Sequence, residues 1–112
     1  MKYHNIKTLY NGLMYDSKKE ARRAYALDVL VMCGRISQLE RQKRFVLQEG
    51  YINNKGEKIL PITYVADFCY YDHDKNAWIV EDVKSPATRT DVYKIKKKLF
   101  EFKYQEYTFL ES

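Results

Sequence analysis

The sequence is poor in the side chains that build zinc sites and disulfide frameworks. Its two cysteines, Cys33 and Cys69, form no C-x-x-C pair, and histidine is limited to His4 and His73. A zinc site made of Cys and His side chains is therefore not expected. With so few cysteines we expect both thiols to be reduced, as in a protein of the cytosol.

Long apolar runs are missing as well. No stretch approaches the roughly 18 apolar residues of a membrane-spanning helix, and the N-terminus MKYHNIKTLYNG has no apolar segment of the signal-peptide kind. We therefore expect no membrane partner. Because internal repeats and low-complexity tracts are also absent, the 112 residues predict one domain, residues 1–112.

Positive charge and tyrosine are abundant instead. Lys and Arg number 20 against 15 acidic residues, and the net charge of +5 favours an anionic partner, most commonly nucleic acid. The 11 tyrosines suit half-buried strands, and they also suit a surface that stacks on bases. Of these two interpretations the strand is the simpler one.

The first third of the chain predicts a β-hairpin followed by a helix. An Asn-Gly pair between short apolar stretches in residues 7–15 is a strong hairpin signal. A helical run follows Ser17 and ends near Cys33, and Gly34 suits the position after a helix C-terminus. Ser17 and Glu20 have the S-x-x-E spacing of a capping box.

The remainder predicts strands, a second helix and a last strand. Stretches with strand-like composition cover residues 36–48, 59–71, 77–83 and 107–110, and turn residues separate several of them. The second helix is expected to begin near Thr90 and to end near Lys103. Its apolar residues lie on one face at helical spacing, namely Val92, Ile95, Leu99 and Phe102. This order predicts a mixed α/β or α+β domain whose central sheet is flanked by helices.

Two acidic residues lie in neighbouring predicted strands. Because side chains alternate between the faces of a strand, Asp82 and Lys84 share one face and Glu81 points the opposite way. Asp67 lies in an otherwise apolar run, where an unpaired carboxylate is costly to bury. A short turn makes the two strands antiparallel neighbours, which brings Asp67 and Asp82 close together.

Two neighbouring carboxylates repel each other unless a cation or a proton lies between them. Mg²⁺ is the natural cation, since it takes oxygen ligands and keeps several waters. Asp67 and Asp82 would hold the ion, and Lys84 would position or activate a water or offset charge in the transition state. A bound metal polarises a phosphoryl oxygen and lowers the pKa of a water. The pattern therefore favours metal-dependent cleavage of phosphodiester bonds in nucleic acid.

Glu20 is a third candidate acid. With Ala24, Leu27 and Val31 it forms one stripe of the first predicted helix, and this stripe should face the sheet. Glu20 would then lie at the inner edge of the first helical turn, aimed toward the strand carboxylates. Its alternative role is the capping box with Ser17, and the two roles are compatible.

Each of these residues also has a plainer interpretation. Asp82 and Lys84 suit a salt bridge on one strand face, because D-x-K is a common tripeptide, and Asp67 suits a hydrogen-bonded strand end. The combination favours a metal site more than its parts do. It places an acid in a helix, an acid in one strand and D-x-K in the next strand of a hairpin.

This order of residues resembles the PD-(D/E)xK nuclease superfamily. The matching positions are Glu20, then Ala66-Asp67, then Asp82-Val83-Lys84, and Ala66 replaces the proline of the name. The chain as a whole also looks like a small phage-encoded family of that superfamily. The stretches that carry this likeness are 15–23, 62–68, 80–84 and 93–100.

The resemblance implies the α-β-β-β-α-β core of restriction endonucleases, here after an N-terminal hairpin, and hydrolysis that depends on Mg²⁺ or Mn²⁺. It implies Asp67 and Asp82 as metal ligands, Lys84 as the catalytic lysine, and Glu20 as an accessory acid that also faces the metal. Because Glu81 adjoins Asp82, a one-residue slip of strand register would exchange their roles.

The function expected from this resemblance is a DNA endonuclease acting in the host cytosol. Relatives include Holliday-junction resolvases, which suggests branched or recombination intermediates as substrates. A small nuclease often acts as a dimer to cut two strands, so a homodimer is one expectation. The rival interpretations are an inactive nucleic-acid-binding module on a nuclease fold and a structural or interaction protein of a phage.

Basic residues flank both acidic elements in the sequence. The candidates for nucleic-acid contact, including polar residues at the start of the second helix, are Lys18, Lys19, Arg22, Arg23, Thr88, Arg89, Thr90, Lys94, Lys97 and Lys98. For any single lysine the plainer interpretation is a solvated helix face. No base-reading motif is visible, which favours recognition of the DNA backbone or shape.

Overall fold

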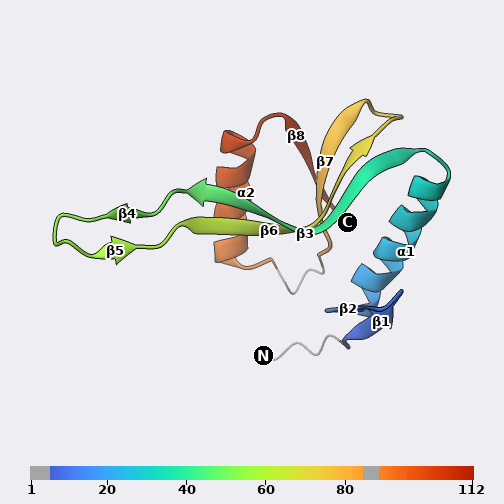
Figure 1. The fold of residues 1–112 in the computed structure, drawn as a ribbon, viewed down its shortest axis with the longest axis horizontal. Coiled ribbons are helices and arrows are strands. Elements are labelled where there is room, and N and C mark those ends of the chain that lie inside the picture. Colours follow the sequence, from blue (N-terminus) through green and yellow to red (C-terminus); the bar gives the residue numbers. More distant parts are fainter. Residues whose placement is uncertain (1–5, 85–88) are drawn as a thin grey trace.

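Four strands form the central sheet in the order β3-β6-β7-β8 (Figure 1). In this computed structural model, which describes residues 6–84 and 89–112, β6 is antiparallel to both of its neighbours and β8 is parallel to β7. The bounds are β3 Ile36–Gln48, β6 Ile62–Asp72, β7 Ala77–Asp82 and β8 Tyr107–Glu111.

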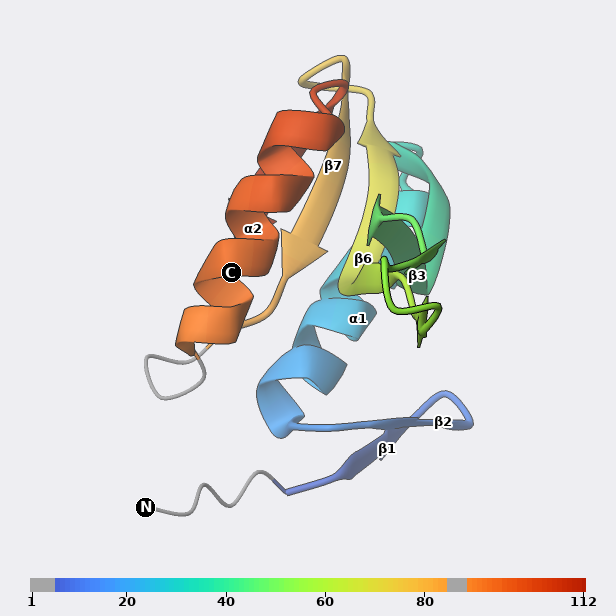
Figure 2. The ribbon, with the colours of Figure 1, turned by 90° about the vertical axis from the view of Figure 1, so that its left-hand side faces the viewer.

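Two helices cover opposite faces of this sheet (Figures 1 and 2). Helix α1 spans Lys18–Met32 and helix α2 spans Asp91–Lys103. Each begins after a hydroxyl side chain that accepts a backbone N–H of the first turn: Ser17 for α1 and Thr90 for α2. The order α1-β3-β6-β7-α2-β8 is the expected α-β-β-β-α-β order, and the prediction of a mixed α+β sheet flanked by helices is confirmed.

Two small hairpins lie outside the central sheet. The first pairs β1 (Thr8–Tyr10) with β2 (Leu13–Tyr15), and its Asn-Gly turn has φ values of 51° and 77°, which suit a type I′ turn. The second pairs β4 (Tyr51–Ile52) with β5 (Lys58–Ile59). The single strand expected over 59–71 is wrong in this respect, because Pro61, which has no backbone N–H, separates β5 from β6.

At Asp67, the side chains of β6 that face α2 give way to side chains that face α1. Tyr64 and Ala66 pack with α2, whereas Phe68 and Tyr70 pack with α1, although all four have the same parity along β6. The register of β3 with β6 places Gln42 opposite Asp67, and Gln42 has a φ of +54°. One half of the β3–β6 ribbon therefore supports α2 and the other half supports α1. Asp67 lies at the crossover between them.

The apolar face predicted for the second helix is not the face that packs. Tyr93 and Phe100 of α2 are buried. The four apolar residues at helical spacing are exposed, by 62%, 57%, 39% and 79%, in the order Val92, Ile95, Leu99, Phe102. In α1 the predicted stripe is buried at its first three positions, whereas Val31 is 40% exposed.

Neither helix has the length and apolar character needed to span a membrane, within the residues that the structure describes.

Candidate functional site

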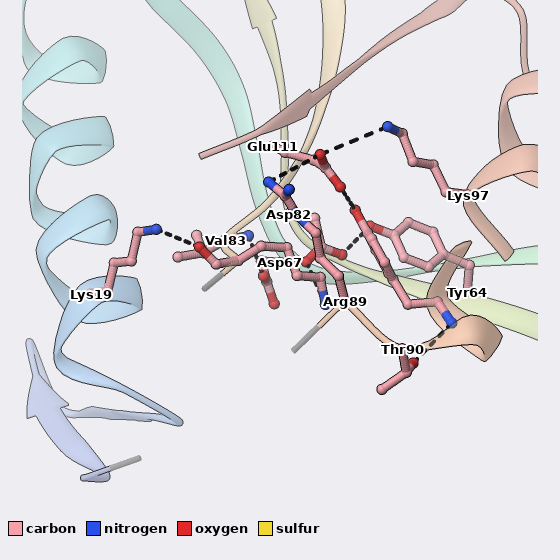
Figure 3. A network of polar contacts seen from close by, with 11 residues as sticks. Lys19, Tyr64, Asp67, Asp82, Val83, Arg89, Thr90, Lys97 and Glu111 are labelled. Carbon is pink, nitrogen blue, oxygen red and sulfur yellow. Dashed lines mark hydrogen bonds and ion pairs between the residues drawn. The ribbon is translucent and has the colours of Figure 1, made fainter. Parts of the chain in front are cut away.

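A pocket of about 450 Å³ opens between the N-terminal ends of α1 and α2 and the middle of the sheet. Glu20, Asp67, Asp82 and Lys84 all line it. They come from α1, β6, the end of β7 and the segment that follows β7. The structure therefore brings together the four residues that the sequence analysis selected, and Figure 3 shows the polar contacts around Asp67 and Asp82.

Asp82 is held on both sides. One carboxylate oxygen lies 3.1 Å from the Lys84 ammonium, and the other accepts a hydrogen bond from the Tyr64 hydroxyl. The Lys84 ammonium also lies 4.0 Å from the ring centroid of Tyr93, within the range of a cation–π contact. Asp82 and Lys84 thus share one face, as strand parity predicts, and their side chains are only 6% and 16% exposed.

Asp67 faces Asp82 from the neighbouring strand. One of its carboxylate oxygens accepts the backbone N–H of Val83 at 2.7 Å. The pKa of Asp67 is raised to about 8, first by burial and then by the nearby charge of Asp82. The Val83 N–H opposes this shift, and Glu20 adds to it through its charge and a hydrogen bond. The carboxyl groups in this pocket therefore repel one another, which a cation among them would relieve.

Glu20 lies in the first turn of α1 and is 6% exposed. Its backbone N–H donates to the Ser17 hydroxyl at 3.1 Å, and its carboxyl group hydrogen-bonds the side chain of Asp67. The helix cap and the position in the pocket thus occur together. Ser17 caps the backbone while the Glu20 side chain points to the strand carboxyls.

Glu81 lies on the opposite face of β7 and does not line the pocket. Its side chain is fully buried and accepts hydrogen bonds from two nitrogens of the Arg23 guanidinium, Nε at 2.5 Å and Nη2 at 2.9 Å. The hydroxyls of Tyr70 and Ser112 each donate to it at 2.7 Å. The register therefore places Asp82 in the pocket. It also gives Arg23 a structural partner, so Arg23 is not part of a free basic surface.

The residues that the sequence analysis missed include Tyr64 and Tyr93, which line the pocket, and Glu111, which lies beside Asp82 in the sheet. Burial raises the pKa of both tyrosines well above the usual range, so both hydroxyls remain hydrogen-bond donors. Tyr93 donates to Glu111 at 2.5 Å. Glu111 pairs with Asp82 in the parallel register of β7 with β8. That register joins distant parts of the chain, and no local pattern indicates it.

The predicted nucleic-acid contacts have several different environments. Lys19 donates to the backbone oxygen of Lys84, and Thr90 lines the pocket. Arg89 and Lys97 lie 3.5 and 3.8 Å from a carboxylate oxygen of Glu111. Lys18, Arg22, Lys94 and Lys98 are exposed to solvent and form no ion pair within residues 6–84 and 89–112. Thr88 lies outside the described residues.

The donors in the pocket fit a hard divalent cation. Mg²⁺ commonly takes one or two protein carboxylates and keeps several waters, which matches Asp67 and Asp82 on adjacent strands. Within residues 6–84 and 89–112, no group of three or more His, Cys, Asp or Glu side chains is placed so that it could hold a metal ion. The fit therefore rests on two strand carboxylates with Glu20 beside them.

Comparison with known proteins gives one match. Residues 1–110 match the family described as "Protein of unknown function (DUF1064)". No curated protein and no solved structure matches the chain. Because the family match covers almost the whole sequence, the chain belongs to the DUF1064 family.

Proposed function

We propose that this protein is a metal-dependent DNA endonuclease of the PD-(D/E)xK superfamily. The observation that carries the proposal is the convergence of Glu20, Asp67, Asp82 and Lys84 in one pocket, in the order that the superfamily motif requires. The raised pKa of Asp67 supports it, because a cluster of like charges is the arrangement that a divalent cation stabilises.

Asp67 and Asp82 would hold Mg²⁺ or Mn²⁺, with Glu20 as the accessory acid. The bound metal supplies Lewis-acid polarisation of a phosphoryl oxygen and a water of lowered pKa. The Val83 N–H and the Tyr64 hydroxyl fix the orientations of the two aspartates. These contacts come from neighbouring strands, so they hold the carboxylates rigidly in place.

Lys84 would offset the negative charge that develops on the scissile phosphate. Its ammonium lies between the Asp82 carboxylate and the Tyr93 ring, at 3.1 and 4.0 Å. This position holds the ammonium at the pocket. A preorganised positive charge at the reacting phosphate contributes to the rate because it needs no rearrangement in the transition state.

The substrate backbone would enter at the N-terminus of α2. Thr90 and Lys96 line the pocket there, and the first backbone N–H groups of a helix favour a phosphate. Lys96 was not among the predicted contacts. In its specific form, the proposal is that the protein is a phage-encoded homodimer. It would cut branched or recombination intermediates in the bacterial cytosol.

The decisive experiment is a cleavage assay with labelled linear duplex, single-stranded and four-way-junction DNA, in Mg²⁺, Mn²⁺ or EDTA. We expect metal-dependent cleavage that Asp82→Asn and Lys84→Ala each reduce at least about 100-fold, the scale of losing a transition-state contact. Matched controls are Asp74→Asn and Lys75→Ala, in the β6–β7 turn, which should cleave like the wild type.

Each alternative outcome is informative. Absence of cleavage with every substrate and metal would contradict the enzyme proposal. Binding without cleavage would favour an inactive DNA-binding module, and neither binding nor cleavage would favour a structural or interaction protein. Cleavage that survives in both site variants would place the active site elsewhere.

A further inference from the structure

A second groove lies beside the first turns of α1, on the side of the N-terminal hairpin. It has a volume of about 600 Å³ and is lined by Leu9 and Tyr10 of β1 and by Lys18, Ala21, Arg22 and Tyr25 of α1. The hairpin and the N-terminal ends of both helices lie at the same end of the molecule (Figure 2). The groove thus lies near the candidate active site and is separate from it.

The floor of this groove is aromatic and apolar. The rings of Tyr10 and Tyr25 meet edge to face with centroids 6.0 Å apart. The Tyr10 hydroxyl donates to Asp28 at 2.7 Å, which anchors this ring against α1. Tyr25 is 59% exposed, and Leu9 is 66% exposed. The groove therefore offers a fixed aromatic edge and an accessible aromatic face, a combination that suits a flat apolar ligand.

The rim of the groove is positively charged. Lys18 and Arg22 stand one turn apart on α1 and are exposed. Within the described part of the chain neither forms an ion pair, in contrast to the next residue, Arg23, which is bound to Glu81. An occupant with a flat apolar portion and adjoining negative charges would satisfy both the floor and the rim.

One helical turn joins the groove to the active-site pocket. Ser17 and Glu20 line the pocket, and Lys18 and Ala21 line the groove. Lys19 lies between them, and its ammonium donates to the backbone oxygen of Lys84. An α-helix with its side chains is only about 10 Å across, so a strand of DNA in the pocket reaches the groove within a few nucleotides.

We propose that this groove binds an unpaired base of the DNA substrate, a proposal that rests on the proposed function for the identity of the ligand. The base would stack on Tyr25, and its flanking phosphates would pair with Lys18 and Arg22. Within a duplex both faces of a base are covered by its neighbours, so only a single-stranded segment fits. The substrate class is then DNA with a single-stranded segment next to the cut site, in preference to continuous duplex.

The test is DNA binding in EDTA, where no metal-dependent cleavage takes place. Fluorescence anisotropy compares a duplex that carries a single-stranded tail with a blunt duplex of the same sequence. We expect the wild type to prefer the tailed duplex. Tyr25→Ala should weaken binding of the tailed duplex about 5- to 100-fold, the range for losing one base–aromatic stack, and leave the blunt duplex unchanged.

Matched variants separate stacking from other effects. Tyr25→Phe keeps the ring and should bind like the wild type. Tyr51→Ala removes a tyrosine of similar exposure, 50% against 59%, from β4, far from the groove along the β3–β6 ribbon (Figure 1), and should change neither affinity. Lys18→Ala and Arg22→Ala should weaken binding of the tailed duplex, because these cations pair with the phosphates that flank the unpaired base. Far-ultraviolet circular dichroism checks that each variant is folded.

The proposal is overturned if the wild type shows no preference for the tailed duplex, or if Tyr25→Ala weakens both DNAs equally or neither. Its failure is distinguishable from failure of the nuclease proposal. A Tyr25-dependent preference without cleavage in any metal would support base binding in the groove and contradict nuclease activity. Metal-dependent cleavage without that preference would support nuclease activity and contradict base binding in the groove.

Discussion

Two carboxyl groups on adjacent strands, buried Glu81 and half-buried Asp67, have opposite electrostatic surroundings in this protein. Glu81 meets a guanidinium and two hydroxyl donors, which neutralise it inside the sheet–helix interface. Asp67 meets one backbone N–H and two other carboxyl groups. A stable fold needs partners such as those of Glu81, whereas the surroundings of Asp67 disfavour its own charge. This contrast at the residue scale distinguishes a structural acid from a candidate ligand.

The pH dependence of stability tests this reading of Asp67. In the folded metal-free protein its pKa is raised from 3.8 to about 8, so between these values the folded state holds a proton that the unfolded state has lost. Stability therefore falls as pH rises through this window. We expect Asp67→Asn to be more stable than the wild type at pH 8, by on the order of 2 kcal/mol, and to lose this advantage near pH 4.

Urea denaturation in EDTA at a series of pH values measures this difference. Asp74→Asn, an exposed carboxylate in the β6–β7 turn, is the control and should follow the wild type. Added Mg²⁺ should stabilise the wild type at pH 8 and leave Asp67→Asn unchanged, since ligand binding to the folded state alone raises stability. A variant that is less stable than the wild type at pH 8 would contradict the assignment.

Local patterns predicted most site residues because local rules govern them. Parity along β7 selects Asp82 over Glu81, and helix phase brings Glu20 to the sheet. Glu111 escaped prediction because it lies beside Asp82 only through the pairing of distant strands. Tyr64 escaped prediction because β6 changes face between Tyr64 and Asp67, so both residues line the pocket although their parity differs. Parity also fails at Asp67, where β6 changes face, so a rule that holds for one strand does not extend to its neighbour.

At the scale of elements, capping and turn residues were reliable guides and apolar periodicity was less so. The N-caps Ser17 and Thr90 and the Asn-Gly turn mark the boundaries that the structure shows. In α2 the periodic apolar face is exposed, and the sheet packs against Tyr93 and Phe100 instead. Periodicity identifies a stripe, but the covered stripe depends on where the helix is docked.

Two phenylalanines of α2 make this distinction measurable. Phe100 is fully buried, with its ring 4.9 Å from that of Phe45, whereas Phe102 is 79% exposed. We expect Phe100→Ala to lower the free energy of unfolding by about 3–5 kcal/mol, the cost of a large core cavity. Phe102→Ala should change it by less than about 0.5 kcal/mol.

Guanidinium unfolding monitored by the fluorescence of Trp78 gives both values from one assay. The pair is matched in residue type, helix and substitution, so helix propensity cancels. Equal losses for the two variants, or a larger loss for Phe102→Ala, would mean that the periodic apolar face is covered in solution. That result would reverse the packing described for α2.

At the scale of the whole molecule, acidic side chains line the pocket and basic side chains surround it. The net charge is +5, yet four acidic residues, Asp16, Glu20, Asp67 and Asp82, line the pocket. Most nearby cations lie on the first turns of α1 and along α2. Some of these cations are already balanced, since Glu111 lies near both Arg89 and Lys97. The unbalanced cations are the ones that can replace counterions on DNA.

The salt dependence of DNA binding measures how many phosphates these basic side chains contact. Contact with about four to six phosphates predicts a slope of about −4 to −5 for log Kobs against log [salt], measured by anisotropy in EDTA. Neighbouring lysines on α2 provide the contrast: Lys98→Ala should lower the magnitude of the slope by about one. Lys97→Ala should lower it by less, because its ammonium already lies 3.8 Å from Glu111. Lys75→Ala, in the β6–β7 turn, is the control and should leave the slope unchanged. A slope near zero for the wild type would show that this basic surface does not bind a polyanion.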